Sequence, residues 1–371
     1  MRRLFSVLLA AGLVLSACGG DSGGGPDPAD DPKGALINAF QNLAEYEGTS
    51  MTFGVDSTSE DLVALAEGDL TEEQADIILN SSIQFKGNQA ESFEDAEGEF
   101  VVDIDGSLIE FRFVDNVVYA RGDVRDLVDK FGGSQEELDA AAAQAGAQFT
   151  FVEPLVEGEW VGFEGFQELM EQAAGGSISS PDPELQKKFT EDLTRAVEDS
   201  ATVTEEGSDD AGTHLVADVN IKDLYNALQE SFASLSQVPG ADLPSGEEIP
   251  DENIKVDFWV DDGFLTQIGF DLVQFKDIEG AEFPEGVDEL SLLLEIEELG
   301  DSIEEPDAAE TVNLQELMGG LMGGLGGLGG TDTDTGTDTE TGGTEDLCET
   351  LKDSPPEVQA QFAEQCPEFA Q

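Results

Sequence analysis

The sequence has few of the residues on which catalytic and metal sites are usually built. Its 371 residues include one histidine, three cysteines and only 15 lysines and arginines, against 83 aspartates and glutamates. The formal net charge of −68 argues against a nucleic-acid partner, because a phosphate backbone is attracted by surfaces rich in lysine and arginine. The same charge disfavours adsorption to anionic lipid head groups.

The single histidine, His214, lies in an alternating segment that predicts a strand. Without a second histidine or a free cysteine it lacks the partners of a catalytic dyad or a zinc site, so we expect it to face the sheet or the surface. Enzyme hypotheses are then left with carboxylates, and 83 of them make any chosen pair uninformative. The sequence therefore predicts no enzyme, no catalytic residue and no cofactor.

Two acidic segments look superficially like calcium loops. In the first, Asp103 and Asp105 precede Gly106, and a hairpin turn explains this pattern. In the second, a loop that starts at Asp332 has Gly343 at the twelfth position, where an EF-hand has its bidentate glutamate. We expect no defined metal site.

The first 17 residues combine the parts of a secretory signal: Arg2 and Arg3, an apolar run over residues 4–15, and small residues before Cys18. The run is shorter than the roughly 20 apolar residues of a membrane-spanning helix. The order Leu-Ser-Ala-Cys resembles the lipobox of bacterial lipoproteins, whose cysteine receives a diacylglyceryl group and becomes the mature N-terminus. The resemblance implies that Cys18 anchors the chain to the cell membrane, on its extracytoplasmic face. A plain secretory signal with a fortuitous cysteine is the alternative.

Composition divides the chain after residue 17 into four parts. Residues 18–34 hold almost no apolar side chain, which predicts a disordered tether. Residues 35–317 carry the periodic patterns of a folded domain. Residues 318–344 are rich in Gly, Thr and Asp, and because each glycine disfavours a helix by about 1 kcal/mol relative to Ala, we expect a disordered linker there. Residues 345–371 are predicted to form a small helical hairpin.

The two remaining cysteines, Cys348 and Cys366, lie in that predicted hairpin. In an exported chain we expect them to form a disulfide, which would stabilise the hairpin by roughly 3 kcal/mol. Two free thiols are the alternative, and they are uncommon outside the cytoplasm. The hairpin would then be structural, or a docking site for an envelope protein.

Helix and strand patterns are both distinct within the folded region. Leu36, Ala39, Phe40 and Leu43 follow the i, i+3, i+4, i+7 spacing of one helix face. Three two-residue turns, at residues 105–106, 115–116 and 262–263, predict β-hairpins. The turns join strands at 100–105 and 108–113, at 108–114 and 117–121, and at 254–261 and 264–275. Further elements are expected as a strand at 51–56 and helices at 61–66, 71–80, 124–130, 135–145, 166–173, 183–198 and 221–235.

Apolar side chains alternate with polar ones along the predicted strands, and the alternate neighbours are often charged, as Glu110, Arg112, Lys255 and Asp257 are. The pattern predicts an α+β fold with a curved antiparallel sheet that has one apolar and one solvated face. The positions expected to share the apolar face are Ile109, Phe111 and Phe113; Val256, Phe258 and Val260; Ile268, Phe270 and Leu272; and Leu290, Leu292, Leu294 and Ile296.

The order of these parts resembles the actinobacterial LppX/LprAFG envelope lipoproteins, which share a LolA-like fold. The resemblance rests on the lipobox, the tether, the first amphipathic helix, the hairpins with charged turns and three segments: Glu-Trp-Val-Gly-Phe at 159–163, Phe-Trp-Val-Asp-Asp-Gly-Phe-Leu at 258–265 and Ile-Glu-Glu-Pro at 303–306. It covers residues 35–317 and includes no sharp motif. The additional helices and the tail after residue 318 depart from the group.

The resemblance implies an incomplete barrel wrapped around helices, with an apolar cavity that holds the acyl chains of a lipid or lipoglycan for transport across the envelope. Affinity would come from buried apolar area, at about 25 cal/mol per Å². A surface-displayed interaction or structural lipoprotein without a ligand is the alternative. For each residue singly, ordinary core packing also remains open. We place six residues on the lipid-binding face: Phe111, Phe113, Phe258, Phe270, Leu292 and Leu294.

Overall fold

The computed structural model describes residues 25–43, 46, 48–88, 90, 95–146, 149–167, 192, 194–226, 249–277, 283–300, 302–315 and 317. The predicted signal and Cys18, the linker at 318–344 and the hairpin with Cys348 and Cys366 lie outside these residues. Most of the helices expected at 166–173, 183–198 and 221–235 also lie outside them.

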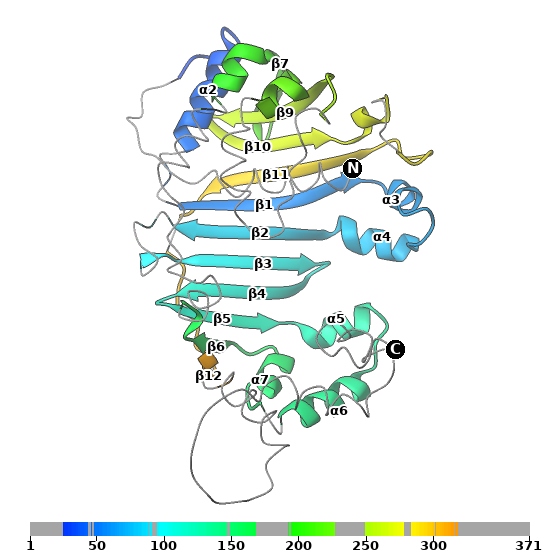
Figure 1. Cartoon of the computed structure of the whole chain (residues 1–371), viewed down its shortest axis with the longest axis vertical. Coiled ribbons are helices and arrows are strands. Elements are labelled where there is room, and N and C mark those ends of the chain that lie inside the picture. Colours follow the sequence, from blue (N-terminus) through cyan, green and yellow to red (C-terminus); the bar gives the residue numbers. More distant parts are fainter. Residues whose placement is uncertain are drawn as a thin grey trace, which may run out of the picture. The chain divides into compact units, whose positions relative to one another are not determined.

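Twelve strands of the described chain form one sheet in the order β12-β6-β5-β4-β3-β2-β1-β11-β10-β9-β8-β7 (Figure 1). All neighbours are antiparallel except β12 and β6, which are parallel. Because β12 and β7 are edges and do not pair, the sheet is not closed, which agrees with the predicted α+β fold and its incomplete barrel. The strands are β1 Gly48–Ser57, β2 Ser81–Asn88, β3 Gly98–Ile104, β4 Ser107–Val114, β5 Val117–Gly122, β6 Val161–Glu164, β7 Thr202–Asp209, β8 Gly212–Asn220, β9 Asn253–Asp261, β10 Phe264–Asp271, β11 Leu290–Glu298 and β12 Glu310–Asn313.

The three predicted hairpin turns are present, and their backbone explains their residues. Asp105, Asp115 and Asp262 have φ values of 51°, 50° and 48°, and each is followed by a residue with positive φ. Two consecutive left-handed residues make the type I′ turn that suits the twist of a hairpin, and Asp, Asn and Gly tolerate that conformation. The strand after the third turn ends earlier than predicted, at Asp271, because residues Val273–Asp277 form a 3₁₀ helix.

The first helix of the described chain, α2 (Pro32–Asn42), begins three residues before residue 35, where the folded region was predicted to start. The Asp31 carboxylate accepts a hydrogen bond from the Gly34 N–H at 3.0 Å, and Pro32 occupies the first helical position. Both features favour helix initiation. Lys33 donates to the carbonyl oxygen of Ala201 at 3.0 Å, so part of the segment expected as tether is bound to the domain.

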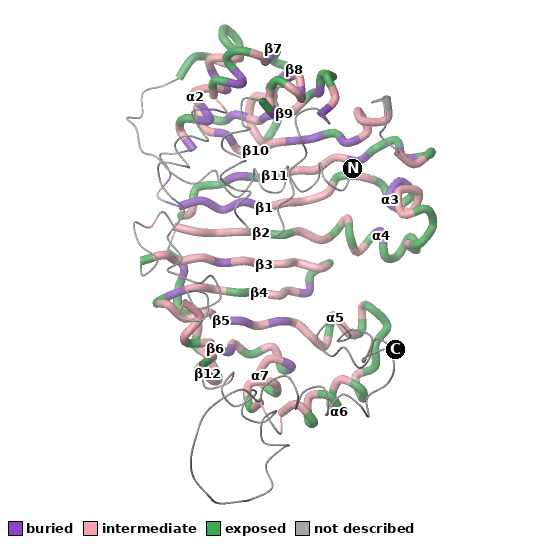
Figure 2. Tube along the Cα trace, in the orientation of Figure 1, coloured by how far each residue is buried: buried purple, intermediate pink, exposed green. Residues whose placement is uncertain are grey.

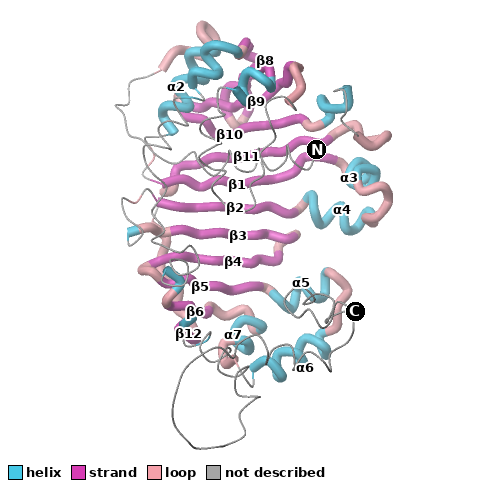
Figure 3. The backbone as a smooth tube through the Cα atoms, in the orientation of Figure 1, coloured by secondary structure: helices cyan, strands magenta, loops and turns pink. Residues whose placement is uncertain are grey.

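Two groups of short helices lie at the end of the sheet where β2 begins and β5 ends (Figure 3). Thr71 and Gln74 form a capping box at the start of α4, which satisfies two N–H groups of its first turn. No helix of the described chain is long and apolar enough to cross a bilayer. The first group is α3 Ser59–Leu65 and α4 Glu72–Leu79, and the second is α5 Val124–Lys130, α6 Gln135–Gly146 and α7 Val152–Val156.

One face of the sheet, which we call the inward face, carries the main core. Cross-strand partners share a face, and one row of partners runs through Phe258, Ile268, Leu294, Phe53 and Ile83. Over β7–β11 this face packs against α2, and at the ends of β1, β10 and β11 it packs against α3 and α4. The first contact forms a cluster that includes Leu36, Phe40, Leu43, Leu215, Phe258, Leu265 and Ile296, and the second one that includes Leu62, Ala75, Ile254, Phe270, Leu272 and Leu290.

The opposite, outward face of β3–β5 was expected to be solvated, and that expectation is wrong. Glu99 and Glu110 are only 8% and 5% exposed. Residues 302–309 cover this face, where Ile303 packs with Val114 and Tyr119. The Tyr119 hydroxyl donates to Glu305 at 2.5 Å, and Arg112 donates to the Glu304 carbonyl oxygen at 3.4 Å, so a segment far away in the sequence packs on this face.

Salt bridges compensate the two buried carboxylates of the outward face. Glu99 lies 2.7 Å from the Lys86 Nζ and 2.6 Å from the Arg112 Nε, and Glu110 pairs with Arg121. The guanidinium groups of Arg112 and Arg121 both lie 4.9 Å from the centre of the Trp160 ring. A buried carboxylate is tolerated only when paired, and these strands supply the cations.

Candidate functional site: an open apolar face

The inward face is covered unevenly. In Figure 2, β2 carries no buried residue, whereas β1 and β11 do. Ile83 on β2 and Phe111 on β4 are 40% and 41% exposed, which is unusual for large apolar side chains in the middle of a sheet. We define the open apolar face as seven inward side chains that are exposed or half-buried: Ile83, Phe85, Phe100, Val102, Ile109, Phe111 and Phe113.

Helices pack on the inward face at two sides of the open apolar face. On the β1 side, Ala75 and Leu62 belong to the same core cluster as Phe270. On the β6 side, the Phe151 ring next to α7 meets the inward ring of Phe163 edge-on, with centroids 5.5 Å apart. The strands between these helices, β2 to β4, therefore present apolar side chains that are only partly covered.

Aromatic rings form a connected row across the open apolar face. Phe53 meets Phe85 edge-on at 5.9 Å, Phe85 lies 4.8 Å from Phe100, and Phe100 stacks on Phe111 at 6.1 Å. These contacts follow the strand register, in which Phe85, Phe100 and Phe111 are direct cross-strand partners. Such pairs hold rings in fixed orientations, so this apolar surface is preorganised.

The inward positions of β1 to β6 hold no charged side chain, although 26% of the residues in the sequence are charged. The charged residues of these strands, such as Lys86, Glu99 and Arg112, all lie on the outward face. The inward positions are Thr49, Met51, Phe53, Val55, Ser57, Ser81, Ile83, Phe85, Gly87, Gly98, Phe100, Val102, Ile104, Ser107, Ile109, Phe111, Phe113, Val118, Ala120, Gly122, Val161 and Phe163.

The six residues placed on the lipid-binding face do lie on the inward face, but in three different surroundings. Phe111 and Phe113 belong to the open apolar face. Phe258 and Leu294 belong to the cluster that packs against α2, and Phe270 and Leu292 to the cluster that packs against α3 and α4. Phe258 and Phe270 are each only 7% exposed, so these two side chains are core residues and do not line the open apolar face.

Sequence reasoning omitted four members of the open apolar face: Ile83, Phe85, Phe100 and Val102. The signal that could have found them is the alternation Ser-Ile-Gln-Phe-Lys at 82–86 and Phe-Val-Val-Asp at 100–103. These segments pair with β1 and β4.

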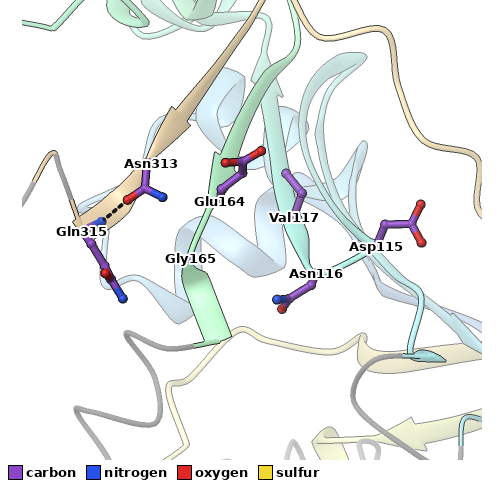
Figure 4. Close-up of a pocket in the computed structure, with 7 residues that line it drawn as sticks. All are labelled: Asp115, Asn116, Val117, Glu164, Gly165, Asn313 and Gln315. Carbon is purple, nitrogen blue, oxygen red and sulfur yellow. Dashed lines mark hydrogen bonds between the residues drawn. The ribbon is translucent and has the colours of Figure 1, made fainter.

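A separate, polar pocket lies at the turn between β4 and β5 and at the end of β6 (Figure 4). It has a volume of about 300 Å³, and its lining includes the carboxylates of Asp115 and Glu164 and the side chain of Asn313, whose Oδ1 accepts from the Gln315 N–H at 3.0 Å. Burial raises the pKa of the nearby Tyr119 hydroxyl, and Glu305 and these two carboxylates raise it further. The pocket suits neither an acyl chain nor an anion.

The contacts of His214 and Asp103, which were weighed as site residues from the sequence, indicate structural roles. His214 lies on the outward face, 2.7 Å from Asp257 and stacked on Trp259 with ring centroids 4.5 Å apart. Asp103 accepts a hydrogen bond from the Gly106 N–H, as expected of a turn residue. Within the described ranges no group of three or more His, Cys, Asp or Glu side chains could hold a metal ion.

Comparison with solved structures finds the lipoprotein LppX from Mycobacterium tuberculosis, with 9% sequence identity and a TM-score of 0.31 over 75% of this chain and 99% of that chain. It also finds LprF from Mycobacterium bovis, with 10% identity and a TM-score of 0.33 over 76% of this chain and 99% of that chain. Both belong to the group that the sequence resembles. At these identities and TM-scores neither structure transfers a ligand to this chain. No family model and no curated protein matches the sequence.

Proposed function

We propose that this protein binds the acyl chains of a lipid on its open apolar face and carries or presents them in the cell envelope. The observation that carries the proposal is the chemistry of the inward positions of β1 to β6, which are uncharged throughout while Ile83 and Phe111 are about 40% exposed. A hydrocarbon chain gains free energy on such a surface in proportion to the apolar area that both partners bury. Binding of this kind needs no reaction and no cofactor.

The charge distribution indicates which part of a lipid the face accepts. No cation lies on the inward face of β1 to β6, because Lys86, Arg112 and Arg121 lie outward and pair with Glu99 and Glu110. An anionic head group would therefore find no partner there, and burying it unpaired would be costly. We infer that the acyl chains occupy the face and that the head group stays in solvent.

The predicted location at the cell membrane agrees with this role. A diacylglyceryl group on Cys18 would keep the protein at the membrane, since two acyl chains anchor stably where one does not. Removal of residues 1–17 would leave a charge of 13 − 83 = −70, and repulsion over about a Debye length would hold the domain off an anionic surface. The hairpin closed by Cys348 and Cys366 would be free to dock an envelope protein.

Lipid analysis of the purified protein tests the proposal. The chain from residue 19 onward, which contains every described residue, is purified from a lipid-producing host, extracted with organic solvent and analysed by mass spectrometry. The proposal predicts stoichiometric lipid, or uptake of a fluorescent acyl ester by the extracted protein. Absence of both would overturn it and would favour a surface-displayed interaction lipoprotein.

A further inference from the structure

Two more large apolar side chains are exposed on the helices beside the open apolar face. Ile78 on α4 is 38% exposed, and Phe131, which directly follows α5, is 62% exposed. Together with Ile83 and Phe111, these are the exposed large hydrophobic residues of the described chain. Single exposed apolar residues are ordinary on protein surfaces, so their positions relative to one another decide their meaning.

Both residues lie at the same end of the sheet. Ile78 lies three residues before Ser81, which is the first residue of β2. Ser81 pairs with Ile104, the last residue of β3. Lys130, the neighbour of Phe131, donates to the Ile104 carbonyl oxygen at 3.1 Å. Figure 1 shows α4 and α5 at this end of strands β2 to β5. Ile78 and Phe131 thus belong to chain segments at the end of the sheet nearest to Ile83.

The backbone around Phe131 is held in place, so its exposure is not that of a frayed helix end. The Phe131 N–H donates to Leu127 at 3.0 Å, and the Gly133 N–H donates to Val128 at 2.7 Å. Gly132 has a φ of 71°, the left-handed conformation with which glycine commonly ends helices. The fold therefore presents this ring to solvent at a fixed site.

Charges near Phe131 restrict the surface that could receive it. Lys130 lies 3.3 Å from the Asp105 carboxylate, and Arg125 forms ion pairs with Asp139 and Glu157. The remaining acidic groups of α5 and α6 are exposed, including Asp126, Asp129, Glu136 and Glu137. This surface would be repelled by an anionic bilayer at low salt and not by a zwitterionic one.

We propose that this end of the sheet, with Phe131 and Ile78 in contact, is a bilayer-docking surface through which acyl chains pass between a zwitterionic membrane and the open apolar face. The inference rests on the proposed function and adds a partner and a route to it. The argument for a lipid partner is location: the exposed side chains on the helices lie at one end of the strands that carry the open apolar face, and a bilayer offers a matching apolar interior.

Transfer from vesicles tests the inference with the chain from residue 19 onward. Phosphatidylcholine vesicles carry a pyrene-labelled acyl methyl ester, and loss of excimer fluorescence reports transfer to protein. We expect Phe131→Ser to slow transfer about tenfold and Ile78→Ser to slow it less, in proportion to exposed apolar area, while Phe131→Leu stays near the original rate. Anionic phosphatidylglycerol in the vesicles should slow transfer, and added salt should restore it.

A second measurement separates this inference from the function on which it rests. The affinity of each variant for the monomeric ester, without vesicles, should stay within about twofold of the original, because neither residue belongs to the open apolar face and substitution of an exposed side chain has little effect on folding. Original affinity with an unchanged transfer rate in Phe131→Ser and Ile78→Ser would overturn the docking surface and leave the proposed function intact, and would point to a protein partner at this end. No binding of monomeric ester by the original chain would overturn both.

Discussion

Phe111→Ser tests the open apolar face quantitatively. The Phe111 ring is 41% exposed, and since a phenylalanine side chain offers about 200 Å² of surface, a bound chain can cover roughly 80 Å² of it. At about 25 cal/mol per Å² this contact contributes about 2 kcal/mol, which corresponds to a loss of about 30-fold in affinity on substitution.

The assay is fluorescence titration of the monomeric pyrene-labelled acyl methyl ester, an uncharged probe chosen because the protein is so acidic. Ile83→Ser, at a residue 40% exposed on the same face, should also lose affinity. Phe131→Ser is the matched control, because this ring is 62% exposed but lies off the inward face. Circular dichroism must show that each variant is folded. Equal affinity of Phe111→Ser, Ile83→Ser and the original chain would refute the reasoning, and so would an equal loss in Phe131→Ser.

Three further predictions concern two buried carboxylates and the lipid anchor. Glu99→Gln should lower the free energy of unfolding, measured by denaturant unfolding, by about 2 kcal/mol. This is the low end for a buried ion pair, because Lys86 and Arg112 keep some exposure. The control Asp288→Asn, at an exposed pair, should change the free energy of unfolding by less than about 0.5 kcal/mol. Asp61 accepts hydrogen bonds from the Thr58 hydroxyl at 2.7 Å and the Asp288 N–H at 2.8 Å, which lower its pKa in that order of importance. Asp61→Asn should therefore destabilise the protein by about 1–2 kcal/mol at neutral pH. Because the folded-state pKa of Asp61 is lowered, its carboxylate stabilises the fold above the unfolded pKa of about 3.9, and this stabilisation is lost as pH falls through the folded-state pKa. The difference in free energy of unfolding between the two proteins should therefore vanish in acid, and a constant difference would contradict this origin. Cys18→Ser should move the expressed protein from the detergent phase to the aqueous phase in a detergent partition, and unchanged partition would contradict the lipid anchor.

Local chemistry made part of the fold predictable. The turns at Asp105, Asp115 and Asp262 follow from residues that tolerate positive φ, and α2 follows from the spacing of Leu36 and Phe40. The early start of α2 depends on the Asp31 cap and on Pro32, which the apolar spacing does not include.

Burial was predictable only in part, because alternation shows which side chains share a face and not what covers that face. Phe111 and Phe258 each follow an acidic residue and have apolar residues two positions away on both sides, yet α2 buries Phe258 and Phe111 stays 41% exposed. Similarly, Glu110 was expected on a solvated face, but residues 302–309, which pack on that face, are far away in the sequence. The candidate site lies where this long-range covering stops.

The most direct test of the central claim is to locate a bound acyl chain by its effect on individual side chains. A stearoyl methyl ester with a nitroxide on its chain is added to methyl-labelled protein, and paramagnetic broadening is measured by NMR. The claim predicts that the Ile83 and Ile109 methyl signals broaden much more than the indole N–H signals of Trp160 and Trp259, which lie on the outward face. Sharp signals from both isoleucines at saturating ester, or broadening centred on the two tryptophans, would contradict it.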